Sequence, residues 1–142
     1  MKFTSSDIAA IVKGKLTGKK DLCVSDITTD SRQLSFAEGL AFLAIRGINH
    51  DGHLYIENLY HKGIRTFLVE RLPDKPEYFT DTAFIVTTDS IHALQLLASH
   101  VRRSFKSPVI AVTGSAGKTV VKEWLADVLG LSVPVVRSPK SY

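Results

Sequence analysis

The sequence predicts an α/β fold in which the strands of a mostly parallel sheet alternate with helices. Three short apolar runs, at 40–45, 64–69 and 83–87, are typical of buried strands. A further apolar run at 109–112 leads directly into a glycine-bearing loop and then a helical pattern. Strand patterns that alternate with helical patterns in this way indicate a parallel sheet covered by helices.

The composition indicates a globular chain with enough apolar residues for a core. Of its 142 residues, 44% are hydrophobic and 23% are charged, which suits one domain plus a piece of another. No run of about eighteen apolar residues is present, so no membrane insertion is expected. The single Cys23 and the lack of a secretory signal point to a cytoplasmic protein. The net charge of +4 is spread along the chain without a basic stripe, so no nucleic acid partner is expected.

The first half of the chain begins with a capped helix. Polar residues at 4–7 are N-cap candidates for a short helix that ends near Gly14. Two brief strands are expected at 22–24 and 27–29, followed by the buried strand at 40–45. Asp51-Gly52 is expected to form a turn that leads into a helix at 53–62, which Gly63 closes.

The second half continues the alternation. After the strand at 64–69, the prolines in 71–80 predict a surface loop. The strand at 83–87 is followed by a long amphipathic helix that Asp89 or Ser90 caps. A polar stretch ends this helix, and we therefore expect one domain at 1–105 and a second at 106–142.

The loop after the strand at 109–112 has the features of a nucleotide phosphate site. Gly114 and Gly117 allow a sharp turn, and Lys118 and Thr119 open a helix whose N-terminus carries partial positive charge. Such a loop would hold the β- and γ-phosphates, while the Thr119 hydroxyl would take one position on Mg²⁺. Because Val112 stands where the general motif has its first glycine, a simple turn that happens to hold Gly-Lys-Thr is the alternative.

A second motif lies upstream, around the strand at 40–45. Asp30-Ser31-Arg32 precedes this strand, which has the form L-x-F-x-A, and G-x-x-x-D-G-H follows it from Gly47 to His53. Taken alone, the first part could be a polar turn in which Asp30 and Ser31 only bond the nearby backbone.

Together the two motifs resemble the Mur ligases, the ATP-dependent enzymes that add amino acids to the peptidoglycan precursor. The loop T-G-S-A-G-K-T, followed by Lys122-Glu123, is similar to the ATP loop of this family. Ser115 and Ala116 favour the branch that adds D-alanyl-D-alanine. The branch that adds the third amino acid remains an alternative, and so does a non-catalytic nucleotide-binding module.

The resemblance implies two domains and two sets of site residues. Residues 1–105 would be the N-terminal domain that binds the UDP-linked precursor. In 106–142, the helix after the loop is expected to end before Gly130 and a strand to follow at 133–136, so this part would be the first strand, P-loop, helix and strand of a truncated central ATPase domain. The ATP loop would comprise Thr113, Gly114, Ser115, Ala116, Gly117, Lys118, Thr119 and Val120, with Lys118 and Thr119 catalytic. The precursor's uridine diphosphate would contact Thr29, Ser31, Ile48, Asn49 and His50, and Arg32 or Arg46 would offset its charge.

The resemblance also implies the reaction of the full-length enzyme. ATP would phosphorylate the terminal carboxylate of UDP-N-acetylmuramoyl-tripeptide, and the amine of D-alanyl-D-alanine would attack the acyl phosphate. Lys118 and Mg²⁺ on Thr119 would stabilise charge on the transferring group. Because the remaining strands of an ATPase domain are missing, we expect an N-terminal fragment that binds its precursor without turnover. Some ligases of this type carry a fused alanine racemase domain, which these residues neither show nor exclude.

Overall fold

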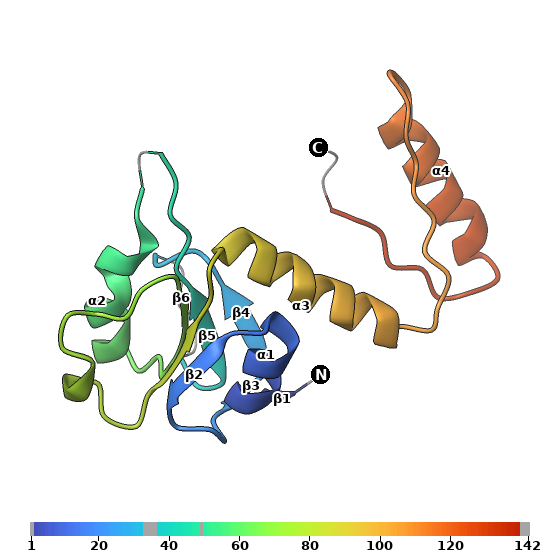
Figure 1. Cartoon of the computed structure of the whole chain (residues 1–142). Helices are drawn as coiled ribbons and strands as arrows, with labels where there is room; N and C mark the ends of the chain where they lie inside the picture. Colours follow the sequence, from blue (N-terminus) through green and yellow to red (C-terminus); the bar gives the residue numbers. More distant parts are fainter. Residues whose placement is uncertain (1, 33–36, 49, 140–142) are drawn as a thin grey trace. The chain divides into compact units, whose positions relative to one another are not determined.

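The protein consists of two compact units, which are described separately here. The computed structural model describes residues 2–32, 37–48 and 50–139. The first unit comprises Met1–Phe105 and the second Lys106–Tyr142 (Figure 1).

A five-stranded sheet in the order β2-β7-β6-β5-β4 forms the centre of the first unit. The four strands β4 to β7 run parallel, and β2, the outermost strand on one side of the sheet, pairs antiparallel with β7. The fold is therefore mixed α/β with a mainly parallel sheet, as the sequence predicts. The bounds are Lys15–Gly18 for β2, Asp26–Thr28 for β4, Leu40–Leu43 for β5, Thr66–Val69 for β6 and Ala83–Val86 for β7.

Helices cover both faces of this sheet because its central strands carry apolar side chains on both sides. Helices α1 (Ser5–Val12) and α3 (Ser90–Ser104) pack on one face, in a core that includes Ile8, Leu43, Leu68, Ile85 and Leu97. Helix α2 (Ile56–His61), which follows the 3-10 helix η1 (Gly52–Tyr55), packs on the other face, in a core with Phe42, Leu59, Phe67 and Phe84.

Local chemistry accounts for how α1 begins. The Thr4 hydroxyl accepts a hydrogen bond from the Asp7 backbone N–H at 3.1 Å, and the Asp7 carboxylate accepts one from the Thr4 N–H at 2.8 Å. This capping box satisfies donors that the first turn of a helix leaves without partners. The same segment pairs as β1 (Phe3–Thr4) with β3 (Cys23–Val24), and a 3-10 helix η2 (Pro76–Tyr78) interrupts the loop after β6.

The second unit contains one helix, α4 (Lys118–Gly130), among its described residues 106–139. The strands expected at 109–112 and 133–136 are not formed, and Val109 and Ile110 are 57% and 62% exposed. A strand needs a neighbour to accept its backbone hydrogen bonds, and no other strand is described within this unit. Gly130 is the last helical residue and Leu131 is the C-cap, so the expected role of Gly130 just beyond the helix is wrong.

None of the helices in the described ranges is long and apolar enough to cross a lipid bilayer.

Candidate functional site

The four parallel strands place their C-terminal ends along one edge of the sheet. Strand β4 ends at Thr28, which pairs with Phe42 of β5, so the chain segments that follow both strands leave the sheet at neighbouring points. The segments after β6 and β7 leave from the same edge. In α/β sheets this edge is where ligands bind. Of the predicted precursor-binding residues, Thr29, Ser31 and Arg32 follow β4, while Arg46, Ile48 and His50 follow β5, so both groups leave the sheet at this end.

The turn after β4 is organised by the carboxylate of Asp30. It accepts hydrogen bonds from the Arg32 backbone N–H at 2.9 Å, from Nε at 3.0 Å and from an Nη at 3.1 Å. The side-chain hydrogen bonds of Arg32, followed by its backbone N–H, lower the pKa of Asp30 from its ordinary value. At the other end of the turn, the Thr28 hydroxyl accepts from the Asp30 N–H at 3.1 Å.

This geometry leaves the turn able to contact a ligand. The Arg32 side chain is 85% exposed, and Asp30 accepts from only two of the N–H groups of its guanidinium. Thr29 is exposed and Ser31 is half-buried beside it. Asp30 thus bonds its own turn, and by doing so it holds the guanidinium group at the sheet edge.

The loop after β5 projects away from the sheet, and its two arms lie close together (Figure 1). An antiparallel bridge between Arg46 and Asp51 closes its neck, and the Gly47 N–H donates to the His50 carbonyl at 2.7 Å. Arg46, Ile48 and His50 are exposed, the Ile48 side chain completely. Asn49, also predicted to bind the precursor, lies outside the described residues.

Asp51 anchors the neck of this loop. Its Oδ1 accepts from the His53 backbone N–H at 3.0 Å and lies 2.7 Å from His53 Nδ1, while its Oδ2 accepts from Arg71 Nη2 at 2.7 Å. The backbone hydrogen bond from His53 is the largest cause that lowers the pKa of Asp51 to about 2, and the side-chain bonds from His53 and Arg71 add to it against the opposing effect of burial.

His53 bridges Asp51 to strand β6. Its Nε2 accepts a hydrogen bond from the Glu70 backbone N–H at 3.0 Å, and its side chain is only 6% exposed. An imidazole nitrogen that accepts from an N–H has no proton of its own. His53 is therefore the neutral tautomer that carries its proton on Nδ1 and donates it to Asp51.

Glu70 continues the connection to helix α3. Its Oε1 accepts from the Ser90 backbone N–H at 3.0 Å and lies 2.8 Å from the Ser90 hydroxyl. The same hydroxyl lies 2.8 Å from the carbonyl oxygen of Ala44, the residue after β5, and Ser90 is fully buried. A chain of hydrogen bonds thus connects the ends of β5 and β6 with the start of α3.

Sequence reasoning missed most of this connection. It interpreted Asp51-Gly52 only as a turn and helix entry. An aspartate side chain often accepts a hydrogen bond from the backbone N–H two residues later, as Asp51 does from His53. Ser90 was predicted only as a helix cap, a role that Asp89 fills by accepting from the His92 N–H at 2.9 Å. No short-range pattern signals that Glu70 and Ser90 meet, because they are twenty residues apart.

The glycine loop of the second unit has backbone angles that favour glycine. Gly114 and Gly117 have φ of 155° and 75°, in or near the region that side chains rarely adopt, and α4 begins directly after Gly117. The Lys118 ammonium donates to the Gly114 carbonyl at 2.5 Å, so its charge already lies across the turn. The other predicted residues of the loop are exposed: Thr113, Ser115, Ala116, Thr119 and Val120.

These features fit a phosphate group better than a metal held by the protein alone. A helix start and an ammonium group across the same turn both favour an anion. Within the described ranges, no group of three or more His, Cys, Asp or Glu residues could hold a metal ion. An Mg²⁺ ion on Thr119 would therefore need phosphate oxygens and water as its remaining ligands.

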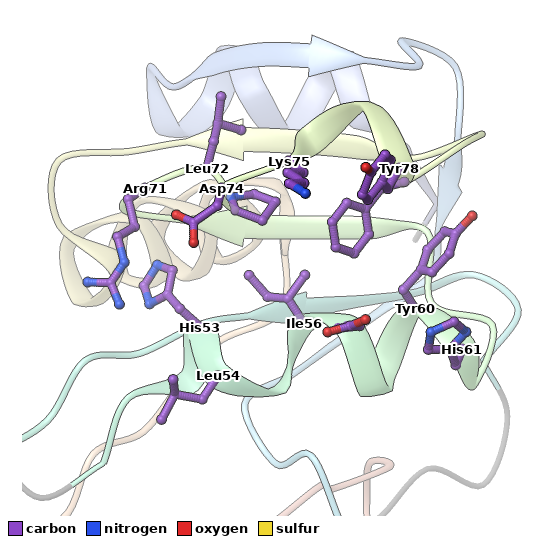
Figure 2. A pocket seen from close by; sticks show the side chains of 13 residues that line it. His53, Leu54, Ile56, Tyr60, His61, Arg71, Leu72, Asp74, Lys75 and Tyr78 are labelled. Carbon is purple, nitrogen blue, oxygen red and sulfur yellow. The ribbon is translucent and has the colours of Figure 1, made fainter.

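A groove of about 690 Å³ lies on the α2 side of the first unit (Figure 2). His53 and Arg71 border one end, Tyr60 and His61 the other, and the loop with Lys75 and Tyr78 forms its upper wall. Among the described residues, none of those predicted to bind the precursor lines it. His53 and Arg71, which do line it, are hydrogen-bonded to Asp51 at the neck of the loop after β5.

The comparisons with known proteins agree on one family. The profile of the "Mur ligase family, catalytic domain" matches residues 24–103, more than half of the chain. The UDP-N-acetylmuramoyl-tripeptide–D-alanyl-D-alanine ligase of Bacillus subtilis is 34% identical over 133 residues, covering 92% of this chain. The UDP-N-acetylmuramoyl-L-alanyl-D-glutamate–2,6-diaminopimelate ligase of Cytophaga hutchinsonii is 36% identical over 106 residues, or 73% of this chain.

A solved structure agrees in fold as well as in sequence. The UDP-N-acetylmuramoylalanyl-D-glutamyl-2,6-diaminopimelate–D-alanyl-D-alanyl ligase of Acinetobacter baumannii superposes with a TM-score of 0.81 at 30% identity, over 94% of this chain. The chain spans 29% of that structure and 28% of the Bacillus relative. The profile match over more than half of the residues shows that the chain belongs to the Mur ligase family.

Proposed function

We propose that this chain supplies the precursor-binding domain and the ATP loop of a ligase that adds D-alanyl-D-alanine to UDP-N-acetylmuramoyl-tripeptide in the cytoplasm. The observation that supports the proposal is that the described residues predicted to bind the precursor follow the C-terminal ends of β4 and β5, two neighbouring parallel strands. The relative from Bacillus subtilis is named for this reaction. In this proposal residues 1–105 bind the precursor and residues 106–142 begin the ATP-binding domain.

Charge and hydrogen-bonding capacity at the sheet edge suit a uridine diphosphate. Arg32 and Arg46 are exposed on the two adjoining segments, where they would neutralise the diphosphate. Thr29, Ser31, Asn49 and His50 would donate or accept hydrogen bonds at the uracil and ribose, and Ile48 would cover an apolar face of the ligand. The first unit then selects the precursor by its nucleotide end.

The second unit would act at the ATP phosphates. When bound, ATP would supply the phosphoryl group that activates the terminal carboxylate of the precursor. Lys118 would neutralise charge on the phosphate oxygens, the backbone of 113–117 would follow their outline, and Thr119 would give one hydroxyl ligand to Mg²⁺. Lys118 and Thr119 are thus the proposed catalytic residues of this chain.

Calorimetric titration with UDP-N-acetylmuramoyl-tripeptide tests the proposal. We expect saturable binding that Ser31→Ala and Arg46→Ala each weaken by about tenfold, the effect of one lost hydrogen bond to a charged ligand. Lys62→Ala is the matched control. Lys62 is also an exposed cation, but it is the C-cap of α2 and precedes the N-terminal end of β6, so it lies at the other end of the parallel strands. Equal effects of Arg46→Ala and Lys62→Ala would contradict the assignment.

The sister ligase that adds the third amino acid is the second candidate, because the Cytophaga relative is named for that activity. The two differ in the precursor they accept. Titration with the precursor that lacks the third amino acid separates them, since tighter binding of this shorter precursor than of the tripeptide would favour the sister ligase.

A further inference from the structure

We infer that Asp51, His53, Glu70 and Ser90 form a positioning network that holds Arg46 and His50, at the neck of the loop after β5, in the conformation that binds the precursor. These four residues are called the edge network below. The inference rests on the proposed function for the identity of the ligand. The control that the network exerts over the loop can be measured without any ligand.

The edge network reaches the loop at both sides of its neck. On one side, the Ser90 hydroxyl lies 2.8 Å from the carbonyl oxygen of Ala44, two residues before Arg46. On the other, Asp51 pairs with Arg46 in the bridge that closes the loop. A backbone hydrogen bond from the Gly52 N–H to the Ile45 carbonyl, at 2.9 Å, lies between these two points. Movement of either anchor would therefore open the neck.

The hydrogen bonds of the network fix one another's direction. His53 must donate from Nδ1 to Asp51 and accept at Nε2 from the Glu70 N–H, which allows only one neutral tautomer. The Ser90 hydroxyl has one hydrogen for two oxygens, Ala44 O and Glu70 Oε1, both at 2.8 Å. The Ser90 hydroxyl can donate to either oxygen without moving its own oxygen atom, so the heavy atoms of the network keep one arrangement.

Burial indicates that the network holds its geometry independently of solvent. Ser90 is fully buried, the His53 side chain is 6% exposed and the Asp51 side chain is 21% exposed. The loop that they support is exposed at Arg46, Ile48 and His50. Glu70, like Asp51, is half-buried, so a support that is fully buried only at Ser90 lies next to an exposed predicted binding segment.

A simple structural role is the competing explanation, and the chain offers a matched control for it. Ser5 and Ser90 are both fully buried, both are the first residue of a helix, and both donate a hydroxyl hydrogen to a backbone carbonyl. Ser5 bonds Lys19, directly after β2, at the opposite edge of the sheet. Ser90 also bonds the Glu70 carboxylate, so Ser90→Ala should lose more stability than Ser5→Ala, and the positioning role is judged from local changes at the loop after β5 and not from stability.

The test measures amide hydrogen exchange at Gly47 and Gly52 in the free 142-residue protein, together with the Kd for UDP-N-acetylmuramoyl-tripeptide. We expect Ser90→Ala to speed exchange at both glycines and to raise the Kd about tenfold. Ser5→Ala should change neither. Arg71→Ala, which removes a partner of Asp51 from a side chain that is 54% exposed, should show the same pattern as Ser90→Ala and provides a variant that keeps the core intact.

The outcomes separate the inference from the function on which it rests. Unchanged exchange at Gly47 and Gly52 in both variants would overturn the inference, whatever the protein binds. Faster exchange with an unaltered Kd would also overturn it, because the loop would then not need its support for binding. If the unmodified protein fails to bind the precursor, the proposed function fails, and the exchange data alone decide whether the network positions the loop.

Discussion

Among single residues, Asp30 and Asp51 organise the segments that follow β4 and β5, because each carboxylate accepts a hydrogen bond from a backbone N–H two residues further on. The sequence predicted binding residues around Arg32, and this turn follows β4, whose last residue pairs with Phe42 of β5. Asp30 also bonds its own turn, as the simpler interpretation expected. The supports Glu70 and Ser90 carry no local signal, because their meeting depends on how β6 and α3 are placed in the fold.

Gly52 provides a test of how tightly the loop neck is packed. A Cβ added there would lie 2.9 Å from both Ala44 Cα and Ile45 N, closer than real contacts allow. We expect Gly52→Ala to lower the free energy of unfolding by about 1–3 kcal/mol, the usual effect of overpacking. Gly47→Ala in the same loop is the control, because its Cβ would meet only the His50 carbonyl oxygen at 3.6 Å. Urea unfolding of both variants measures the difference, and equal losses would contradict the close approach.

The lowered pKa of Asp51 predicts how its contribution to stability depends on pH. Because the pKa is about 2 in the folded protein and 3.8 ordinarily, the carboxylate stabilises the fold fully above its unfolded pKa and loses that effect as the pH falls toward 2. Asp51→Asn should therefore cost about 1.5–3 kcal/mol at neutral pH, the range for hydrogen bonds to a charged group. Urea unfolding at intervals from pH 7 to pH 2 should show this difference shrinking below pH 4. A difference that stays constant would show that the charge of Asp51 does not matter.

Among the helices and strands, the sequence predicted those whose hydrophobic periodicity and capping residues agree. It failed for segments that become strands only when they pair with another strand. The central strands β5, β6 and β7 and the helices α1, α3 and α4 appear as expected, within a few residues. Strand β2 was missed because its four residues, between Lys15 and Gly18, carry little apolar pattern and become a strand only by pairing with β7. The strands expected at 109–112 and 133–136 fail for the converse reason, since an apolar run forms a strand only beside a partner.

Helix α1 should depend measurably on its capping box. Thr4→Ala removes the hydroxyl that accepts from the Asp7 N–H, and we expect a loss of about 1 kcal/mol in the free energy of unfolding. Thr4→Ser keeps the hydroxyl and should recover most of this loss. Thermal unfolding followed by circular dichroism measures both variants, and equal destabilisation by serine and alanine would assign the effect to the lost methyl group of Thr4 instead.

At the scale of the whole molecule, the two units differ in how they bury apolar side chains. Every buried hydrophobic residue that the structure describes belongs to the first unit, in the cores on the two faces of its sheet. In the described residues of the second unit, none of the side chains of α4 is buried, and Val128 and Leu131 are 64% and 87% exposed. Cooperative unfolding depends on a shared core, so the first unit should dominate the unfolding transition.

Trp124, the single tryptophan of the chain, allows this division to be measured. It lies on α4 and is 69% exposed, so its fluorescence reports on the second unit alone. We expect circular dichroism to show a cooperative urea transition, while Trp124 emission changes little across the same range because its indole is already in water. A Trp124→Phe and Phe79→Trp double variant moves the probe beside Tyr60 and Phe84, and its emission should follow the dichroism. Coincident transitions of Trp124 emission and dichroism in the unmodified chain would instead show that the two units unfold as one.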